Sequence, residues 1–357
     1  MSLFGIKRAL TRALHTDIAF AFDIDGVLLR SKTPIPGASE ALKLLNNEKI
    51  PYIMLTNGGG VLEKQRTEFL SDALDVEISP LQIVQSHTPF KALVNRHKKV
   101  LCCGVDTVRE VAETYGFETV VQPVDILALN KVISPFTAAS DEYLKRVARK
   151  HKSLSKTPFE AIMVFNDPRD WATDIQIISD LLNSDRGYLG TLRKGTSEQP
   201  SIPIYFSNDD LLWANHYHLN RFGQGAFRII INSLYSKLNG GKKLNDVSIG
   251  KPTKLSYDFA NHVLIDWRQK LIDGTTNSTE QLLPELGISP KASPFEKVYM
   301  VGDNPASDII GAFNYGWESC LVRTGVFSDG DKLPCKPTMI VDNVLQAVIK
   351  SLEGHNS

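Results

Sequence analysis

The sequence predicts an α/β protein with a parallel sheet in its core and a second, smaller α/β domain inserted into the chain. Two observations support this prediction. Apolar runs of strand length alternate with segments of helical periodicity along most of the 357 residues. Acids, a hydroxyl residue and a lysine also follow several of these runs directly, where open α/β sheets place their ligands. The composition, with 42% hydrophobic and 22% charged residues, is that of a globular protein.

Charge, hydropathy and cysteine usage narrow the class of protein. The 40 basic and 40 acidic side chains balance, so the net charge favours neither nucleic acid nor an anionic membrane as a partner. No apolar run approaches the ~18 residues of a membrane-spanning helix, and we expect no integral membrane span. The four cysteines show no Cys-x-x-Cys spacing, and Cys102 and Cys103 lie within an apolar run. This pattern predicts buried free thiols and a reducing compartment.

The amino terminus has the composition of a targeting segment. The first 16 residues contain Lys7, Arg8, Arg12 and His15 among regularly placed hydrophobic residues, and they contain no acid. A short basic amphipathic segment of this kind is typical of a mitochondrial presequence, which we place at residues 1–17. The alternative is an ordinary first helix packed on the core, in which case we expect a cytoplasmic protein.

The first predicted strand ends in two carboxylates. The run from Ile18 to Val27 is apolar and aromatic except for Asp23, Asp25 and Gly26. The run therefore predicts a buried strand that stops where the acids begin. Burying a carboxylate without a partner is costly, which favours a functional role for an Asp-x-Asp pair at this position. Taken alone, the same residues also fit a structural Asp-Gly turn.

A hydroxyl residue and three glycines follow the second predicted strand. The backbone N–H groups of Thr56, Asn57 and Gly58, followed by a helix amino terminus, would suit the binding of a phosphate group. The alternative is a flexible turn without a ligand, and the glycines alone favour that alternative. The elements predicted here are helices over 37–48 and 61–74, a strand over 50–55, and a helical stretch that continues to about residue 95.

The middle of the chain is predicted to be an inserted domain over 97–245, which divides the core into 18–96 and 246–357. The α/β pattern repeats within the insertion, and the strand-end acids resume only after it. A polar run with Gly240 and Gly241 is predicted to be the exit linker. The predicted elements of the insertion are strands over 99–104, 161–166 and 202–207 and helices over 108–115 and 171–182.

Two further polar motifs follow the insertion. A short strand over 247–249 is predicted to end at Lys251, and a buried strand over 297–301 is predicted to end at Gly302, Asp303 and, five residues later, Asp308. The other elements predicted here are a helix over 257–267, a long exposed polar loop over 268–296, and strands over 319–323 and 338–341.

If these strands share one parallel sheet, their polar ends converge on one edge. Three or four clustered carboxylates repel one another and favour a cation, and ligands that are all oxygen suit Mg²⁺. Asp303 would then hold the metal, and Asp308 would be a second ligand or a support for it. A metal beside a lysine and a set of backbone amides is a site for an anion, of which phosphate is the obvious candidate.

The same residue types support phosphoryl transfer. Asp23 can act as the nucleophile and form an aspartyl-phosphate, and Asp25 can protonate the leaving group and later activate water. Thr56, the Asn57 amide and Lys251 would hold the phosphoryl oxygens. Together, these residues indicate phosphoryl transfer more specifically than any one of them does alone.

The four motifs, in this order and spacing, resemble those of the haloacid dehalogenase superfamily of phosphatases. The long insertion between the second and third motifs is similar to the class IIA arrangement, and segments such as 165–168, 220–227 and 250–254 resemble eukaryotic members of the cat eye syndrome critical region protein 5 type in their fungal mitochondrial form. The resemblance implies a Rossmann-like core with an α/β cap domain. It also implies Mg²⁺ bound by Asp23, by the backbone carbonyl of Asp25 and by Asp303, and relatives often dimerise through the cap.

The resemblance directs attention to one loop of the insertion. Residues 208–215 follow a predicted strand and mix Asn, Asp and Trp, which suits the recognition of a small polar substrate. An ordinary turn is an equally good interpretation. The candidate substrate-selecting residues are Asn208, Asp210 and Trp213.

The sequence as a whole predicts a magnesium-dependent phosphatase that hydrolyses a small phosphorylated metabolite. Candidate substrates include glycerol phosphates, phosphoglycolate, nucleotides and precursors of phospholipid head groups, so a role in glycerophospholipid metabolism is one possibility. The alternative is a non-catalytic scaffold that retains the fold and binds a partner through the polar loop over 268–296. A phosphotransferase that passes the phosphoryl group to an alcohol is a third hypothesis.

Overall fold

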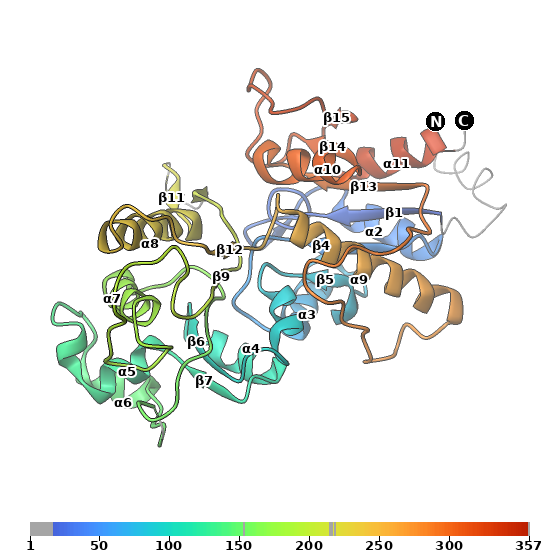
Figure 1. Cartoon of the computed structure of the whole chain (residues 1–357). Coiled ribbons are helices and arrows are strands. Elements are labelled where there is room, and N and C mark those ends of the chain that lie inside the picture. Colours follow the sequence, from blue (N-terminus) through green and yellow to red (C-terminus); the bar gives the residue numbers. More distant parts are fainter. Residues whose placement is uncertain (1–16, 153, 214–216, 218, 356–357) are drawn as a thin grey trace. The chain divides into compact units, whose positions relative to one another are not determined.

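The structure of the chain is a computed structural model that describes residues 17–355 except 153, 214–216 and 218 (Figure 1). The predicted presequence therefore lies outside the described residues apart from Asp17. The chain divides into two compact units. The first comprises residues 1–56, 63–85 and 251–357, and the second comprises 57–62 and 86–250. The sequence placed the inserted domain at 97–245, so the second unit begins earlier and ends later than that segment.

The first unit is built on a six-stranded sheet in which every pairing is parallel. The strand order β15-β14-β13-β1-β4-β5 places the strand that ends in the two carboxylates beside the strand that leads to Asp303. The predicted α/β fold with a parallel core sheet is confirmed. The strands are β1 (Ile18–Phe22), β4 (Tyr52–Leu55), β5 (Ile83–Val84), β13 (Lys297–Gly302), β14 (Glu318–Val322) and β15 (Met339–Val341).

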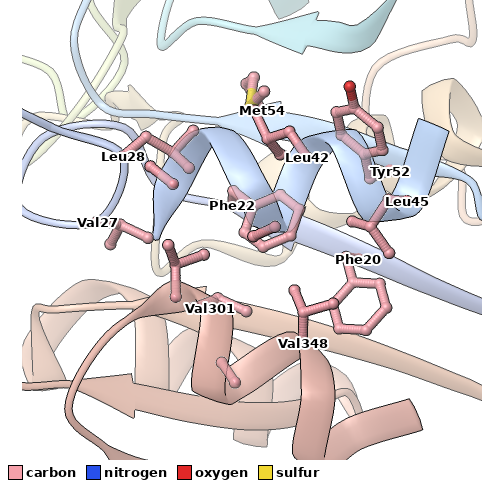
Figure 2. Close-up of a cluster of buried hydrophobic side chains, with 14 of the residues drawn as sticks. Phe20, Phe22, Val27, Leu28, Leu42, Leu45, Tyr52, Met54, Val301 and Val348 are labelled. Atoms are coloured by element: carbon pink, nitrogen blue, oxygen red, sulfur yellow. The ribbon is translucent and has the colours of Figure 1, made fainter. Parts of the chain in front are cut away.

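Helices cover both faces of this sheet. Successive side chains of a strand point to opposite faces, so each face contributes to a hydrophobic cluster of its own. On β1, Phe20 and Phe22 pack into one hydrophobic cluster, whereas Ala19 and Ala21 belong to another. Figure 2 shows the first cluster, in which Phe20 and Phe22 lie among apolar residues such as Val301. The helices of this unit are α2 (Ala38–Asn47), α3 (Glu63–Leu74), α9 (Lys254–Asp273), α10 (Ile310–Tyr315) and α11 (Val344–His355).

Helix α9 is longer than the sequence analysis predicted. It begins after Thr253, whose side chain caps the amino terminus by accepting a hydrogen bond from the Ser256 N–H, and it ends at Gly274 in the left-handed conformation. The prediction of a polar loop from residue 268 was therefore wrong for residues 268–273. These polar residues occupy the last turns of the helix, where Asp266 pairs with Lys270 at 3.5 Å.

The second unit contains its own five-stranded sheet, in the order β12-β9-β8-β6-β7, and all its pairings are parallel. Apolar residues of these strands pack with helices of the same unit in a separate core. A short antiparallel hairpin, β10 (Leu212–Trp213) and β11 (Arg221–Phe222), precedes the last helix of the unit. The sheet strands are β6 (Lys99–Cys103), β7 (Thr119–Val121), β8 (Ala161–Val164), β9 (Ile204–Phe206) and β12 (Val247–Ser248), and the helices are α4 (Val108–Tyr115), α5 (Pro123–Leu129), α6 (Asp141–Val147), α7 (Trp171–Leu182) and α8 (Gln224–Leu238).

The strand before Lys251 does not belong to the core sheet, which corrects the expectation that four strand ends of one sheet carry the motifs. Strand β12 pairs with β9 in the second unit, and the Ile249 N–H donates a hydrogen bond to the Phe206 carbonyl at 2.8 Å. Lys251 is the second residue after this pairing, and it lies just before α9 in the first unit.

The cysteines agree with the sequence analysis. All four cysteines are free thiols, and Cys102, Cys103 and Cys320 are buried. Among the helices described, none is both long enough and apolar enough to cross a bilayer.

Candidate active site

Three of the predicted acids come together at the carboxyl edge of the six-stranded sheet. Asp23 follows β1 directly, and Asp303 follows β13, which pairs with β1 in parallel register from Ile18 to Phe22. Asp308 lies on a π-helical turn over Pro305–Ile309 that begins immediately after Asn304. One carboxylate oxygen from each acid lies within 4.8 Å of the others.

Lys251 supplies the positive charge of this cluster. Its side chain is 2% exposed, and its ammonium Nζ donates hydrogen bonds to Asp23 Oδ1 at 2.8 Å and to Asp308 Oδ1 at 2.6 Å. Although burial disfavours a charged lysine, the two carboxylates hold its pKa above the usual value. The ammonium is therefore charged at every physiological pH, and the cluster retains more acids than bases.

Close packing against glycines fixes the two acids of the fourth motif. A Cβ atom on Gly302 would lie 2.2 Å from the Cβ of Asp308, and one on Gly325 would lie 1.8 Å from Asp303 Oδ2. The Val326 N–H donates a hydrogen bond to that same Oδ2 at 2.7 Å. Both acids are therefore held by backbone that approaches closely because a side chain is missing.

The two acids differ in how their oxygens are used. Asp308 accepts from Lys251 through Oδ1 and from the Asn304 N–H through Oδ2 at 3.1 Å. Burial raises the pKa of Asp308 to about 6, and burial together with the Asp23 and Asp308 charges raises the pKa of Asp303 to about 8. Such clustered, desolvated carboxylates gain from a bound cation.

Asp25 lies at the same edge but outside the carboxylate cluster. Its side chain is 60% exposed, and Oδ2 lies 3.7 Å from the Arg66 guanidinium on α3. The surrounding protein and the Asp23 charge raise the pKa of Asp25, although Arg66 opposes the shift. A raised pKa on an accessible carboxyl is what a proton donor needs.

The predicted phosphate-binding residues lie where the chain leaves the core sheet. Thr56 follows β4 and is 4% exposed, and its N–H donates to the Val84 carbonyl at 3.0 Å. Asn57 and Gly58 already belong to the second unit. There the Asn57 Nδ2 donates to Asp210 Oδ1 at 3.1 Å, and the Gly58 carbonyl accepts from the Ser86 N–H at 3.2 Å.

The residues predicted to select substrate fall into two groups. Asn208 is 5% exposed, and its Nδ2 donates to the Asn57 carbonyl at 3.3 Å, so Asn208 and Asp210 both bind the same residue. Trp213 is 48% exposed on strand β10, and its indole N–H donates to the Phe222 carbonyl across the hairpin at 3.2 Å. No hydrogen bond described for Trp213 joins it to the other two residues.

Several residues that hold the site together carry no signal in the sequence. Besides Val326 and Arg66, the Tyr257 hydroxyl donates to the Asp308 carbonyl at 3.0 Å, and the Thr324 hydroxyl donates to the Gly26 carbonyl at 2.5 Å. These contacts use backbone groups or lie far apart in the sequence. No local sequence pattern predicts these contacts.

The donor set fits a small, hard cation. The oxygens come from buried carboxylates, as Mg²⁺ prefers, and Asp23, Asp303 and Asp308 form a group that could hold such an ion. Because both oxygens of Asp308 already accept hydrogen bonds, Asp23 and Asp303 are better placed to be ligands, and Asp308 is better placed to orient Lys251.

Two family models match this chain, one beginning in each of the two segments that the sequence assigned to the core. Residues 20–118 match the model of the haloacid dehalogenase-like hydrolases, and residues 248–347 match a second model of HAD-hydrolase-like proteins. A mitochondrial hydrolase of Saccharomyces cerevisiae is 61% identical over 339 residues, which cover 95% of this chain and 96% of that protein.

Two further relatives extend the comparison. A cardiolipin synthase (CMP-forming)/mitochondrial hydrolase fusion protein of Schizosaccharomyces pombe is 41% identical over 97% of this chain, which spans 55% of the fusion protein. A p-nitrophenyl phosphatase from Archaeoglobus fulgidus has a similar fold, with a TM-score of 0.58 and 16% identity over 93% of this chain and 98% of that one.

Proposed function

The chain belongs to the haloacid dehalogenase-like hydrolases, and we propose that it is a magnesium-dependent phosphatase that hydrolyses a small phosphate monoester. The observation that carries the proposal is the buried Lys251 ammonium between Asp23 and Asp308, with Asp303 beside them, at the carboxyl edge of the sheet. Surplus carboxylates that attract a metal, next to a fixed ammonium, form a site for a dianion such as a phosphoryl group.

The carboxylates of Asp23 and Asp303 would hold Mg²⁺, together with the backbone carbonyl of Asp25 that the family resemblance implies, and Asp308 would support them. When bound, the metal offsets negative charge on the phosphoryl oxygens. Lys251 contributes a second positive charge from a position that its two hydrogen bonds fix. Thr56 and the backbone amides of Asn57 and Gly58 provide donors to the remaining oxygens.

The reaction proceeds in two steps on the protein's own side chains. An oxygen of Asp23 attacks phosphorus, the bond to the leaving oxygen breaks, and Asp25 gives that oxygen its proton. Water then attacks the phosphorus of the aspartyl-phosphate while Asp25 takes a proton from the water. This step releases phosphate and restores the Asp23 carboxylate.

Two further observations support a cellular location and a class of substrate for this chain. The basic first 16 residues and the mitochondrial name of the relative in Saccharomyces cerevisiae support a mitochondrial location for this chain. The fusion relative joins a hydrolase to a cardiolipin synthase. Phosphate monoesters of glycerophospholipid chemistry are therefore the first substrates to test, alongside other small phosphorylated metabolites.

The test is phosphate release from a panel of phosphate monoesters, with Mg²⁺ or with EDTA, for wild type and for Asp23→Asn. We expect turnover that needs the metal and that the substitution reduces by at least about 10³-fold, because Asp23 is the nucleophile. Asp23→Asn keeps the size of the side chain, and thermal unfolding checks that the variant is folded. A folded wild-type protein that binds Mg²⁺ but releases no phosphate from any substrate would contradict the proposal and favour the scaffold hypothesis.

A further inference from the structure

The chain passes between the two units at four points, and two of these points adjoin residues of the proposed active site. The peptide bond from Thr56 to Asn57 leads into the second unit, and the bond from Gly250 to Lys251 leads out of it. The chain also crosses after Leu62 and after Gln85. Residues that fix Asn57 and Gly250 within the second unit are therefore one bond away from Thr56 and Lys251.

One loop of the second unit contacts three of these crossing points. This loop, residues 207–210, follows strand β9. Asn208 donates to the Asn57 carbonyl at 3.3 Å, and Asp210 accepts from the Asn57 side chain at 3.1 Å. Both ends of Asn57, its side-chain amide and its backbone carbonyl, are thus bound by the 207–210 loop.

The other two contacts involve Ser86 and Gly250. The Ser86 hydroxyl donates to the Ser207 hydroxyl at 3.2 Å, at the third crossing. Gly250 has φ +78°, and a Cβ atom on it would lie 2.6 Å from the Ser207 carbonyl oxygen and 2.9 Å from the Asn208 Cα. The residue before Lys251 therefore packs directly on the backbone of the loop.

The loop is itself rigidly held by the second unit. Gln224 is fully buried at the start of α8, and its Oε1 accepts from the Asn208 N–H at 3.1 Å. The Ser207 hydroxyl donates to the Phe165 carbonyl at 2.9 Å, and the Asp210 N–H donates to Asn208 Oδ1 at 3.1 Å. A loop fixed in this way can orient what it binds.

We propose that the 207–210 loop is a positioning device for the active site, and that Asn208 and Asp210 are positioning residues that act through Asn57 on Thr56. This inference rests on the proposed phosphatase function, because it assigns Thr56 to the phosphoryl group. It gives Asn208 and Asp210 a role different from the substrate selection that the sequence suggested. Since every substrate of the enzyme carries the same phosphoryl group, their effect is common to all substrates.

The first test measures the segment itself and needs no activity. Amide hydrogen exchange is followed in peptides that cover residues 52–62 and 83–90 of the full chain. Asp210→Ala and Asn208→Ala should each raise exchange in these peptides by about fivefold, because each removes a hydrogen bond from Asn57. Asp209→Ala is the matched control. Its carboxylate pairs with Arg228 at 2.8 Å, which keeps Asp246 as a partner, so exchange in both peptides should not change.

The second test separates positioning from substrate contact. kcat/KM is measured for wild type, Asp210→Ala and Asp210→Asn with phosphate monoesters whose leaving groups differ in size and polarity. Positioning predicts that Asp210→Ala lowers kcat/KM by a similar factor, about three- to tenfold, for every substrate. Asp210→Asn should restore most of the loss, because it keeps an oxygen that accepts from Asn57.

The outcomes distinguish this inference from the proposed function. Unchanged exchange in both peptides, or losses that vary widely with the leaving group, would overturn the positioning role. Raised exchange in a protein that hydrolyses none of the substrates would keep the structural role of the loop and reject the phosphatase function.

Discussion

Replacing Lys251 by methionine is the most direct test of the charge arrangement in the carboxylate cluster. Methionine fills a similar volume but cannot donate to Asp23 or Asp308, which lie 2.8 and 2.6 Å from the ammonium. The substitution leaves their carboxylates and that of Asp303 crowded within 4.8 Å without the lysine charge. The consequence should be visible in stability before any catalytic effect is considered.

The magnitude follows from burial. At an effective dielectric constant of about 20, each ammonium–carboxylate contact at this distance amounts to about 6 kcal/mol of attraction, most of which is offset by desolvation. Removing one partner of a buried ion pair typically costs about 3–5 kcal/mol, because the other charge stays behind. For units of this size, such a loss lowers the midpoint of thermal unfolding by roughly 6–20 °C.

The assay is thermal unfolding of wild type and Lys251→Met in EDTA at pH 8.5 and at pH 5.5. The variant should be more destabilised at the higher pH, because burial raises the pKa of Asp303 to about 8 and of Asp308 to about 6, and protonation at low pH relieves the repulsion. Added Mg²⁺ should recover part of the loss by stabilising the folded state that binds it. kcat should fall by about 10²–10³-fold, as for other fixed charges that stabilise a transition state.

The control is Lys64→Met on α3, where the lysine is exposed and lies 3.9 Å from Glu68. An exposed pair of this kind contributes at most about 1 kcal/mol, so unfolding should change little. If Lys251→Met in EDTA at pH 8.5 unfolds at the wild-type temperature, the buried ammonium does not stabilise the acids and the reasoning fails.

Three further predictions test other parts of the molecule. Gly325→Ala places a methyl group 1.8 Å from Asp303 Oδ2 and should displace that carboxylate, which weakens Mg²⁺ binding by at least about tenfold in calorimetric titration. Asp303→Asn should largely abolish the rise in unfolding temperature that Mg²⁺ produces in wild type, while the fold persists in EDTA; an undiminished rise would contradict Asp303 as a ligand. In the second unit, burial raises the pKa of Asp174 to about 8, so the folded state retains a proton that the unfolded state loses above about pH 4. The free energy of unfolding of wild type should therefore fall as the pH rises from 4 to 8, by up to about 1.4 kcal/mol per pH unit. Urea unfolding at pH 4 and at pH 8 measures this loss, which Asp174→Asn should lack.

Asp23 and Asp303 could be singled out as candidate site residues from the sequence because their positions depend on local patterns. Asp23 and Asp303 each follow a buried apolar run, and parallel pairing of these runs brings their ends to one edge. Helices over 108–115 and 171–182 were predicted with the bounds that the structure shows, since apolar periodicity and capping residues are local too.

Other features could not be predicted because they depend on contacts between distant segments. Strand β5 has two residues and lies in a segment that the sequence analysis interpreted as helical. Strand β12 also has two residues, and nothing within Val247–Ser248 indicates whether it pairs with the core sheet or, as observed, with β9. The groups that hold the acids, such as the Val326 N–H and the Tyr257 hydroxyl, have no local signature.

The misassigned strand has a consequence for how Lys251 is placed. Had β12 belonged to the core sheet, the sheet alone would fix the ammonium, as it fixes Asp23 and Asp303. Instead, the residue before Lys251 is held by the second unit through the β9–β12 pairing and the close approach of Gly250 to Ser207. The residue after Thr56 is held there by Asn208 and Asp210. The acids of the site thus depend on one sheet, whereas the residues bonded directly to its lysine and its threonine are held within the second unit. Substitutions of Asn208 or Asp210 should therefore affect phosphate binding more than metal binding.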